Sequence, residues 1–300
     1  MSGDREVWAD FWAASGPAAG CLPRALEEID AAERALWQDF ARRLPKGARV
    51  LDLGTGDGAV PAKMAEARRD LRLTGVDSSP RLPRAPRGVT LRAGVPIEAL
   101  PFAAASFDAV TSQFGYEYAD AAAAAREVAR VLKPGGRLLF VVHRSDGSIL
   151  AHNLPRREAL VWALEGGWLA KARALAAARR GAPLPTPPAF RTAAEEAQRR
   201  FPRQSVAAEF LQAVAQTLEM GRTKPPHESL EVLDTLEAKA RNEIGRIDSL
   251  ARAACDEARL AELAAGLREA GIAIDPPGTL AERGSKRPFA WLLSGARRSA

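Results

Sequence analysis

The sequence has little cysteine and no long hydrophobic run, and these absences narrow the possible classes of protein. Its 300 residues include only two cysteines, Cys21 and Cys255, so neither a disulfide framework nor a cysteine-based metal site is expected. No apolar stretch approaches the roughly 18 residues of a membrane-spanning helix. The first residues carry acids and lack a basic-then-apolar leader, so no secretory signal is predicted. We therefore expect a cytoplasmic protein with no membrane span and no metal.

Negative charge is scarce in one segment. The chain has a formal net charge of +6 with ordinary hydrophobic (47%) and charged (27%) fractions, as in globular proteins generally. Residues 148–205 contain ten lysines and arginines against four acids, which accounts for the whole excess. A local excess of this kind would suit an anionic partner. It would also suit an ordinary solvated helix face, because the arginines alternate with alanines.

The pattern along the chain predicts an α/β protein with a doubly wound sheet. Residues 1–47 are predicted to form an N-terminal helical extension, with Trp8, Phe11 and Trp12 close together. From residue 48, short apolar runs alternate with alanine-rich ones, as in parallel sheets covered by helices. The expected strands are 49–53, 72–76, 89–93, 107–113 and 137–143, with helices near 60–68 and 119–132.

The strand signal then disappears over residues 148–258, which we predict to be a helical insertion that caps the sheet. Helical runs are expected near 157–180, 192–201, 205–220 and 229–270, and Trp162 and Trp168 fall in the first of them. Two last strands are expected within 271–284 and 287–298. The sheet domain would therefore comprise residues 48–147 and 259–300, interrupted by the insertion.

A glycine-rich turn follows the first predicted strand. The stretch DLGTGDG supplies Gly54, Gly56 and Gly58, and bare backbone there allows N–H groups to face a ligand. Asp77 follows Gly58 by nineteen residues, where the second strand should end, and its carboxylate could accept both hydroxyls of a ribose. A tight turn and a helix cap are the structural alternatives. The loop and the acid together predict an adenosine-containing cofactor.

Four motifs in this order carry a resemblance to a known family: VLDLGTGDG, then GVDSS, then EALPFAAASFDAVTSQFGYEYAD, then VLKPGGRLLFVVH. They resemble the class I S-adenosylmethionine-dependent methyltransferases, in the branch that methylates small molecules. The resemblance implies a Rossmann-like sheet of seven strands, the last antiparallel. It also implies S-adenosyl-L-methionine as cofactor and S-adenosyl-L-homocysteine as product. The LKPGG motif is interpreted as a turn from a helix into the fifth strand.

The resemblance also assigns cofactor contacts. The methionine end would lie on the glycine loop, the ribose on Asp77, and the methyl donor beside the end of the fourth strand. Where the family commonly has Gly-Asp-Ala before Leu-Pro-Phe, this chain reads AGVPIEALPF, so backbone groups replace a carboxylate at the adenine. The cofactor residues implied are Asp52, Gly54, Thr55, Gly56, Gly58, Asp77, Ser78, Pro96, Ile97 and Gln113, with Ser112 beside the last.

The reaction would take place outside the carboxyl ends of the strands. Tyr116 and Glu117 follow the fourth strand and His143 ends the fifth, so these three are the catalytic candidates. His143 could act as a general base if the acceptor must lose a proton. A packed aromatic ring and a helix-dipole partner are the structural alternatives for Tyr116 and Glu117. An amine or thiol acceptor could need no base.

Three other functions remain open from the sequence. The basic insertion could serve a tRNA or rRNA methyltransferase, although no RNA-binding module is recognisable. A nicotinamide-dependent oxidoreductase shares the sheet and the acid, but its third glycine should come one residue later. A cofactor-binding protein without turnover would need no catalytic side chain. A small-molecule methyltransferase is the main prediction.

Overall fold

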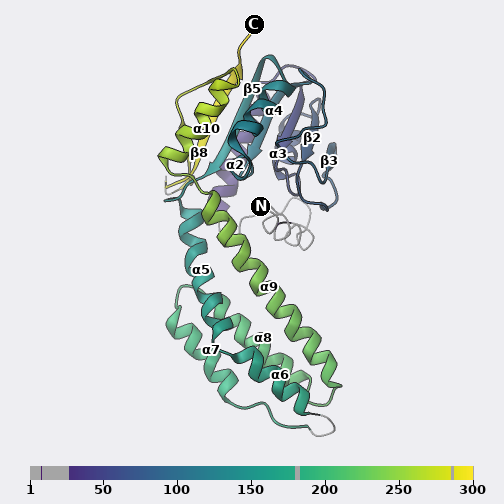
Figure 1. Cartoon of the computed structure of the whole chain (residues 1–300), viewed down its shortest axis with the longest axis vertical. Helices are drawn as coiled ribbons and strands as arrows, with labels where there is room; N and C mark the ends of the chain where they lie inside the picture. Colours follow the sequence, from purple (N-terminus) through teal and green to yellow (C-terminus); the bar gives the residue numbers. More distant parts are fainter. Residues whose placement is uncertain (1–7, 9–26, 180–182, 285–286, 300) are drawn as a thin grey trace. The chain divides into compact units, whose positions relative to one another are not determined.

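The computed structural model describes Trp8 and residues 27–179, 183–284 and 287–299 (Figure 1). Phe11, Trp12 and most of the predicted N-terminal extension lie outside the described residues. The chain divides into two compact units, one of Met1–Leu150 with Leu250–Ala300 and one of Ala151–Ser249. The first unit contains the sheet, and the described elements of the second are helices.

The sheet of the first unit has the strand order β3-β2-β1-β4-β5-β8-β6. The first five of these strands are parallel, while β8 is antiparallel to both β5 and β6. Six strands therefore run one way and β8 runs the other, which confirms the predicted doubly wound fold. The strands are β1 (Arg49–Leu53), β2 (Arg72–Val76), β3 (Val89–Arg92), β4 (Phe107–Gln113), β5 (Leu132–His143), β6 (Ile272–Ile274) and β8 (Pro288–Arg297).

One further strand was not predicted. Residues Gly278–Ala281 form β7, which pairs antiparallel with β8 along the same edge as β6. The described residues thus form eight strands where seven were predicted. The segment was missed because its run is only four residues long and follows two prolines, which read as turn signals.

The LKPGG motif makes an irregular start to β5. Leu132 pairs with Phe107, and regular pairing resumes only at Arg137 opposite Ala109. Gly135 has a φ of 74°, a value that glycine adopts without a Cβ clash. The segment therefore turns the chain into the strand as predicted.

Helices cover both faces of the sheet (Figure 1). On one face, α4 (Ala121–Val131) and α10 (Glu257–Glu269) pack on side chains such as Leu51 and Leu53. On the other, α2 (Glu27–Arg42) and α3 (Ala59–Ala67) pack on Val50 and its neighbours. Alternate residues of β1 thus enter opposite cores, as the period of a strand requires.

The second unit has a core of its own. It contains α6 (Trp168–Ala178), α7 (Ala189–Arg200), α8 (Val206–Met220) and most of α5 (Ser148–Glu165) and α9 (Pro226–Ala253). The core is rich in alanine and includes Leu160, Phe190, Leu211 and Leu233. The helices of this unit therefore bury their apolar faces against one another.

The predicted helical run 229–270 is wrong as a single element. It is two helices, α9 and α10, separated at Ala254–Asp256. The Cys255 N–H donates to the His143 carbonyl at 2.8 Å, and the Cys255 carbonyl accepts from Ser145 N at 3.0 Å. Asp256 then caps α10 by accepting from Arg259 N at 2.8 Å. These contacts with distant residues break the helix, and periodicity alone carries no information about them.

Within the described residues, none of the helices combines the length and the apolar character needed to cross a membrane.

Candidate functional site

The glycine loop joins β1 to α3 and has the bare backbone that the sequence predicted. Gly54, Gly56 and Gly58 have φ values of 61°, 52° and 80°, all in the left-handed region that favours glycine. A Cβ on Gly54 would lie 2.9 Å from the Gly115 Cα. The loop after β1 and the loop after β4 therefore touch backbone to backbone, which brings the two predicted halves of the site together.

Asp77 lies at the end of β2 with its carboxylate toward the glycine loop. Its Oδ2 accepts from Gly56 N at 2.9 Å, and its Oδ1 accepts from Ser79 N at 2.8 Å. Burial raises the pKa of Asp77, and the two N–H donors oppose that rise. The predicted pairing of the acid with the loop is thus present, and Ser78, beside it, is only partly buried.

Asp52 is a carboxyl group inside the sheet. It lies on β1 between Gly75 and Thr111, and Thr111 Oγ1 donates to its Oδ1 at 2.7 Å. Burial raises the pKa of Asp52 to about 7. A Cβ on Gly75 would lie 2.3 Å from Thr55 Oγ1, so this glycine makes room for the Thr55 side chain. Gly75 and Thr111 were missed in the sequence because their roles depend on strand register.

The segment expected beside the adenine runs next to Asp77. Val95 N donates to the Asp77 carbonyl at 2.8 Å, and Pro96 follows directly. Ile97 is buried in the core under α4 and α10, so its side chain serves packing. The backbone of residues 95–97 therefore lies near Asp77, and its contact with an adenine stays a prediction.

Glu117 and His143 form a buried pair at the carboxyl ends of β4 and β5. Glu117 Oε1 accepts from His143 N at 3.0 Å and lies 2.7 Å from His143 Nδ1. Both residues are buried, and Glu117 Oε2 has no hydrogen-bond partner in the part of the chain that the structure describes. The contact assigns the donor role to Nδ1–H, so Nε2 carries the lone pair of the neutral ring.

Aromatic rings hold the His143 imidazole. Phe114 stacks on it with ring centroids 4.0 Å apart, and Tyr118 approaches it edge-on at 6.3 Å. Trp8 in turn packs edge-on against Tyr118 at 6.0 Å. Phe114 has a φ of 57°, which is strained for a residue with a Cβ. Strain of this kind is retained where the surrounding structure fixes a side chain in a particular place.

Tyr116 occupies a different environment from the other two catalytic candidates. Its side chain is fully buried in the core and stacks on Phe140 with centroids 4.5 Å apart. Burial raises the pKa of Tyr116 well above its usual value, which opposes an ionised phenolate. Its surroundings thus fit the packed-aromatic alternative that the sequence also allowed.

Gln113 ends β4 and contacts a polar cluster under α2. Trp37 Nε1 donates to Gln113 Oε1 at 2.5 Å. One turn earlier on α2, Glu33 accepts from Lys63 Nζ of α3 at 2.8 Å, and both side chains are buried. Neither Glu33 nor Lys63 was among the site residues predicted from the sequence. The available signal was an acid on the apolar stripe of α2, four residues from Ile29 and four from Trp37.

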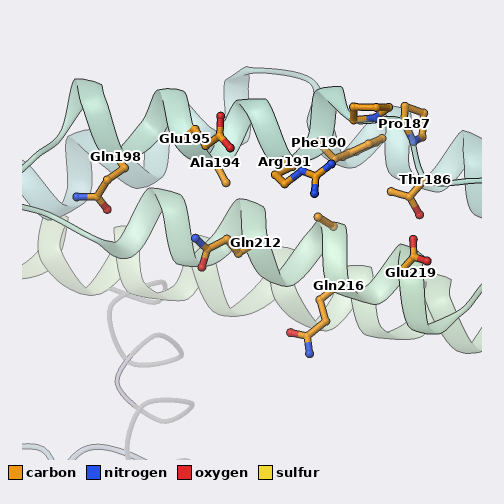
Figure 2. A pocket seen from close by; sticks show the side chains of 12 residues that line it. Thr186, Pro187, Phe190, Arg191, Ala194, Glu195, Gln198, Gln212, Gln216 and Glu219 are labelled. Atoms are coloured by element: carbon orange, nitrogen blue, oxygen red, sulfur yellow. The ribbon is translucent and has the colours of Figure 1, made fainter.

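A cavity of about 730 Å³ lies between α7 and α8 in the second unit (Figure 2). Its polar lining mixes both signs of charge with amides, from Arg191, Glu195, Gln198, Gln212, Gln216 and Glu219. None of the predicted site residues lines it. Within the described ranges, no group of three or more His, Cys, Asp or Glu could hold a metal ion.

The glycine loop, the strand-end acid and the strand order define a class, the doubly wound α/β proteins that bind a cofactor at the carboxyl edge of the sheet. Residues 51–140 match the family model described as a methyltransferase domain. A demethylmenaquinone methyltransferase of Corynebacterium kroppenstedtii is 41% identical over 109 residues, which cover 34% of this chain and 46% of that protein.

Other known proteins give similar matches. A ubiquinone biosynthesis O-methyltransferase of Xanthomonas axonopodis is 38% identical over 109 residues, covering 33% of this chain and 45% of that protein. The chain thus spans about half the length of the curated relatives it matches. Among solved structures, a Burkholderia thailandensis 1,6-didemethyltoxoflavin-N1-methyltransferase is 14% identical with a TM-score of 0.46, covering 100% of this chain and 88% of that one.

Residues 51–140 thus contain a methyltransferase domain, which supports the resemblance to the class I S-adenosylmethionine-dependent methyltransferases. The matched residues run from β1 through β5 and include the glycine loop, Asp77 and Glu117. They exclude α2, the helical unit and the last three strands.

Proposed function

We propose that this protein transfers a methyl group from S-adenosylmethionine to a small molecule whose methylated atom loses a proton. The relatives named for quinone biosynthesis support a small acceptor with an acidic O–H or C–H group. The observation that carries the proposal is the buried contact between Glu117 and His143 at the carboxyl ends of β4 and β5, which leaves the other ring nitrogen of His143 as an acceptor.

The residues present fit the cofactor. The left-handed glycines leave a strip of backbone without Cβ atoms, and the buried Asp77 carboxylate lies against it. In our proposal Asp77 binds the ribose hydroxyls, Ser78, Pro96 and Ile97 border the adenine, and Asp52, Thr55 and Gln113 lie near the methionine end. The cofactor supplies a sulfonium methyl group, whose transfer to a nucleophile is an in-line displacement.

His143 would act as the general base. Glu117 accepts from Nδ1–H and holds the ring, so Nε2 can take the proton of the acceptor. The acceptor atom then forms a bond to the methyl carbon while the bond from sulfur to that carbon breaks. The products are the methylated acceptor, S-adenosylhomocysteine and a protonated His143 that returns its proton to solvent. Positioning of the two reactants within about 3–3.5 Å supplies a further part of the acceleration.

We also propose that the segments outside the cofactor site, residues 1–47 and 148–258, select the acceptor and exclude water. Support for the N-terminal segment comes from one aromatic side chain. Trp8 packs on Tyr118, which in turn contacts the His143 ring. Indoles near an acceptor would favour planar or apolar compounds.

A labelled-methyl assay tests the role of His143. Wild-type protein is incubated with labelled S-adenosylmethionine and a panel of quinols and phenols, and a methylated acceptor is identified. We expect His143→Asn to lower the rate by roughly 10²–10⁴-fold, because proton removal loses its base. S-adenosylhomocysteine affinity should change by less than about threefold, because the ring lies on the acceptor side.

The matched control is His227→Asn on α9, where the histidine is exposed. It should leave the rate unchanged. If His143→Asn retains the wild-type rate, or if both substitutions lower it equally, then His143 is not the base.

A further inference from the structure

A buried polar cluster between α2 and α3 contains a carboxylate oxygen without a well-formed hydrogen bond. Lys63 Nζ lies 2.8 Å from Glu33 Oε2 and 2.9 Å from Asp30 Oδ1. The Glu33 and Lys63 side chains are 2% and 8% exposed. Glu33 Oε1 is buried and has no hydrogen bond of normal geometry among the described residues. Burial raises the pKa of Glu33, and Lys63 and the nearby Gln113 amide oppose that rise.

The buried Glu33–Lys63 pair adds little stability if it serves only to pack α2 against α3. A buried ion pair is often no more stable than apolar side chains of similar volume, because both charges lose their water. A buried acceptor whose nearest donor is poorly aligned destabilises the folded protein further. Since leucine and methionine would fill the same space, the polar pair needs another explanation. A ligand that donates to Glu33 Oε1 would provide one.

The cluster lies at the edge of the sheet where the cofactor is proposed to bind. Lys63 is in the second turn of α3, which begins directly after Gly58. Glu33 is one helical turn before Trp37, and Trp37 Nε1 donates to Gln113 at the end of β4. The pair is thus flanked by the glycine loop's own helix and by the residue expected beside the methyl donor.

We propose that Glu33 and Lys63 recognise the α-amino-acid end of the cofactor. Glu33 Oε1 accepts a hydrogen bond from the ammonium group, and the third N–H of Lys63, beyond those on Glu33 and Asp30, donates to the carboxylate. An adjacent anion and cation match the zwitterion of an amino acid in sign. This inference rests on the proposed function. It adds residues of α2 and α3, of which Glu33 lies outside the matched domain.

Two ligands that differ only in the amino-acid end test the proposal. S-adenosylhomocysteine has that end, while 5′-methylthioadenosine lacks it and keeps the adenosyl thioether. Affinities of wild type and Glu33→Gln for both are measured by titration calorimetry. We expect Glu33→Gln to weaken S-adenosylhomocysteine by roughly 10–100-fold, as for loss of a charged hydrogen bond. The affinity for 5′-methylthioadenosine should change by less than about threefold.

The control is Glu66→Gln. Glu66 also joins the two helices, through Arg34, but that pair is about half exposed. We expect no change in affinity for either ligand. A second variant, Glu33→Leu with Lys63→Met, keeps the packing apolar and should fold even if the single variant does not. It should show the same selective loss.

Equal losses for both ligands, or no loss for either, would overturn the assignment of Glu33 and Lys63 while leaving the proposed function intact. If wild-type protein binds neither ligand, the proposed cofactor and this inference fall together.

Discussion

At the scale of a single residue, the burial of the Asp52 carboxyl group lowers the free energy of unfolding at neutral pH. Its carboxyl group is enclosed by neighbouring strands and accepts one hydrogen bond from Thr111. The ionised form is disfavoured there, so the pKa is raised to about 7 from 3.8. In the unfolded chain the same group loses its proton near pH 4. Between these values the folded state holds one more proton, so the free energy of unfolding falls as pH rises.

We therefore predict that Asp52→Asn stabilises the cofactor-free protein, and more at pH 8 than at pH 5. The amide removes the ionisation penalty, which is complete above about pH 7, and keeps an oxygen for Thr111. The expected gain at pH 8 is roughly 1–4 kcal/mol in the free energy of unfolding. Urea unfolding at the two pH values measures it. An equal change at both would show that Asp52 titrates normally.

At the scale of elements, the contact between the loops after β1 and β4 joins the two halves of the site. Gly54 meets Gly115 so closely that a methyl group on either would touch backbone of the other. Gly115 is two residues from Glu117, and Gly54 is two from Gly56, the N–H donor to Asp77. A shift in this one contact would move the proposed base relative to the cofactor loop.

A comparison of two glycines isolates that contact. Gly47 and Gly54 have similar φ values of 69° and 61°, but no described atom lies within 4 Å of a Cβ on Gly47. Gly47→Ala should cost about 1–2 kcal/mol of stability from the left-handed backbone alone. Gly54→Ala should cost more and should also weaken S-adenosylhomocysteine binding.

Thermal unfolding and calorimetry of both variants check this. Equal destabilisation of the two, with affinity kept in Gly54→Ala, would mean that the close approach of the loops is not needed.

Elements marked by residue spacing or by apolar runs within a few residues could be predicted from the sequence. Features that depend on contacts between residues far apart in the chain could not. The glycine loop, Asp77 and the five parallel strands follow from spacing and from apolar runs within a few residues. The break between α9 and α10 comes from Cys255 pairing with His143 and Ser145. The pairs Glu33–Lys63 and Glu117–His143 likewise join segments about 30 residues apart, although His143 and Glu117 were each singled out by position.

At the scale of the whole molecule, part of the basic excess of residues 148–205 is matched by acids within its own unit. Arg156 is 2.9 Å from Glu243, Arg173 is 2.6 Å from Asp234, and Arg157 pairs with Asp248. These three acids belong to α9, outside the segment in which the charges were counted. Arginines already paired along a helix offer less positive charge to phosphates. These three pairs weaken the support for the RNA alternative.

The other predictions depend on the proposal that an adenosyl cofactor binds beside Gly56 and Asp77, which are joined by a hydrogen bond of 2.9 Å. Titration calorimetry of wild type and Asp77→Ala with S-adenosylhomocysteine and with NAD tests it most directly. We expect roughly micromolar affinity of wild type for S-adenosylhomocysteine, a loss of at least about tenfold in Asp77→Ala, and far weaker binding of NAD. Tight binding of NAD alone, or unchanged S-adenosylhomocysteine affinity in Asp77→Ala, would contradict it.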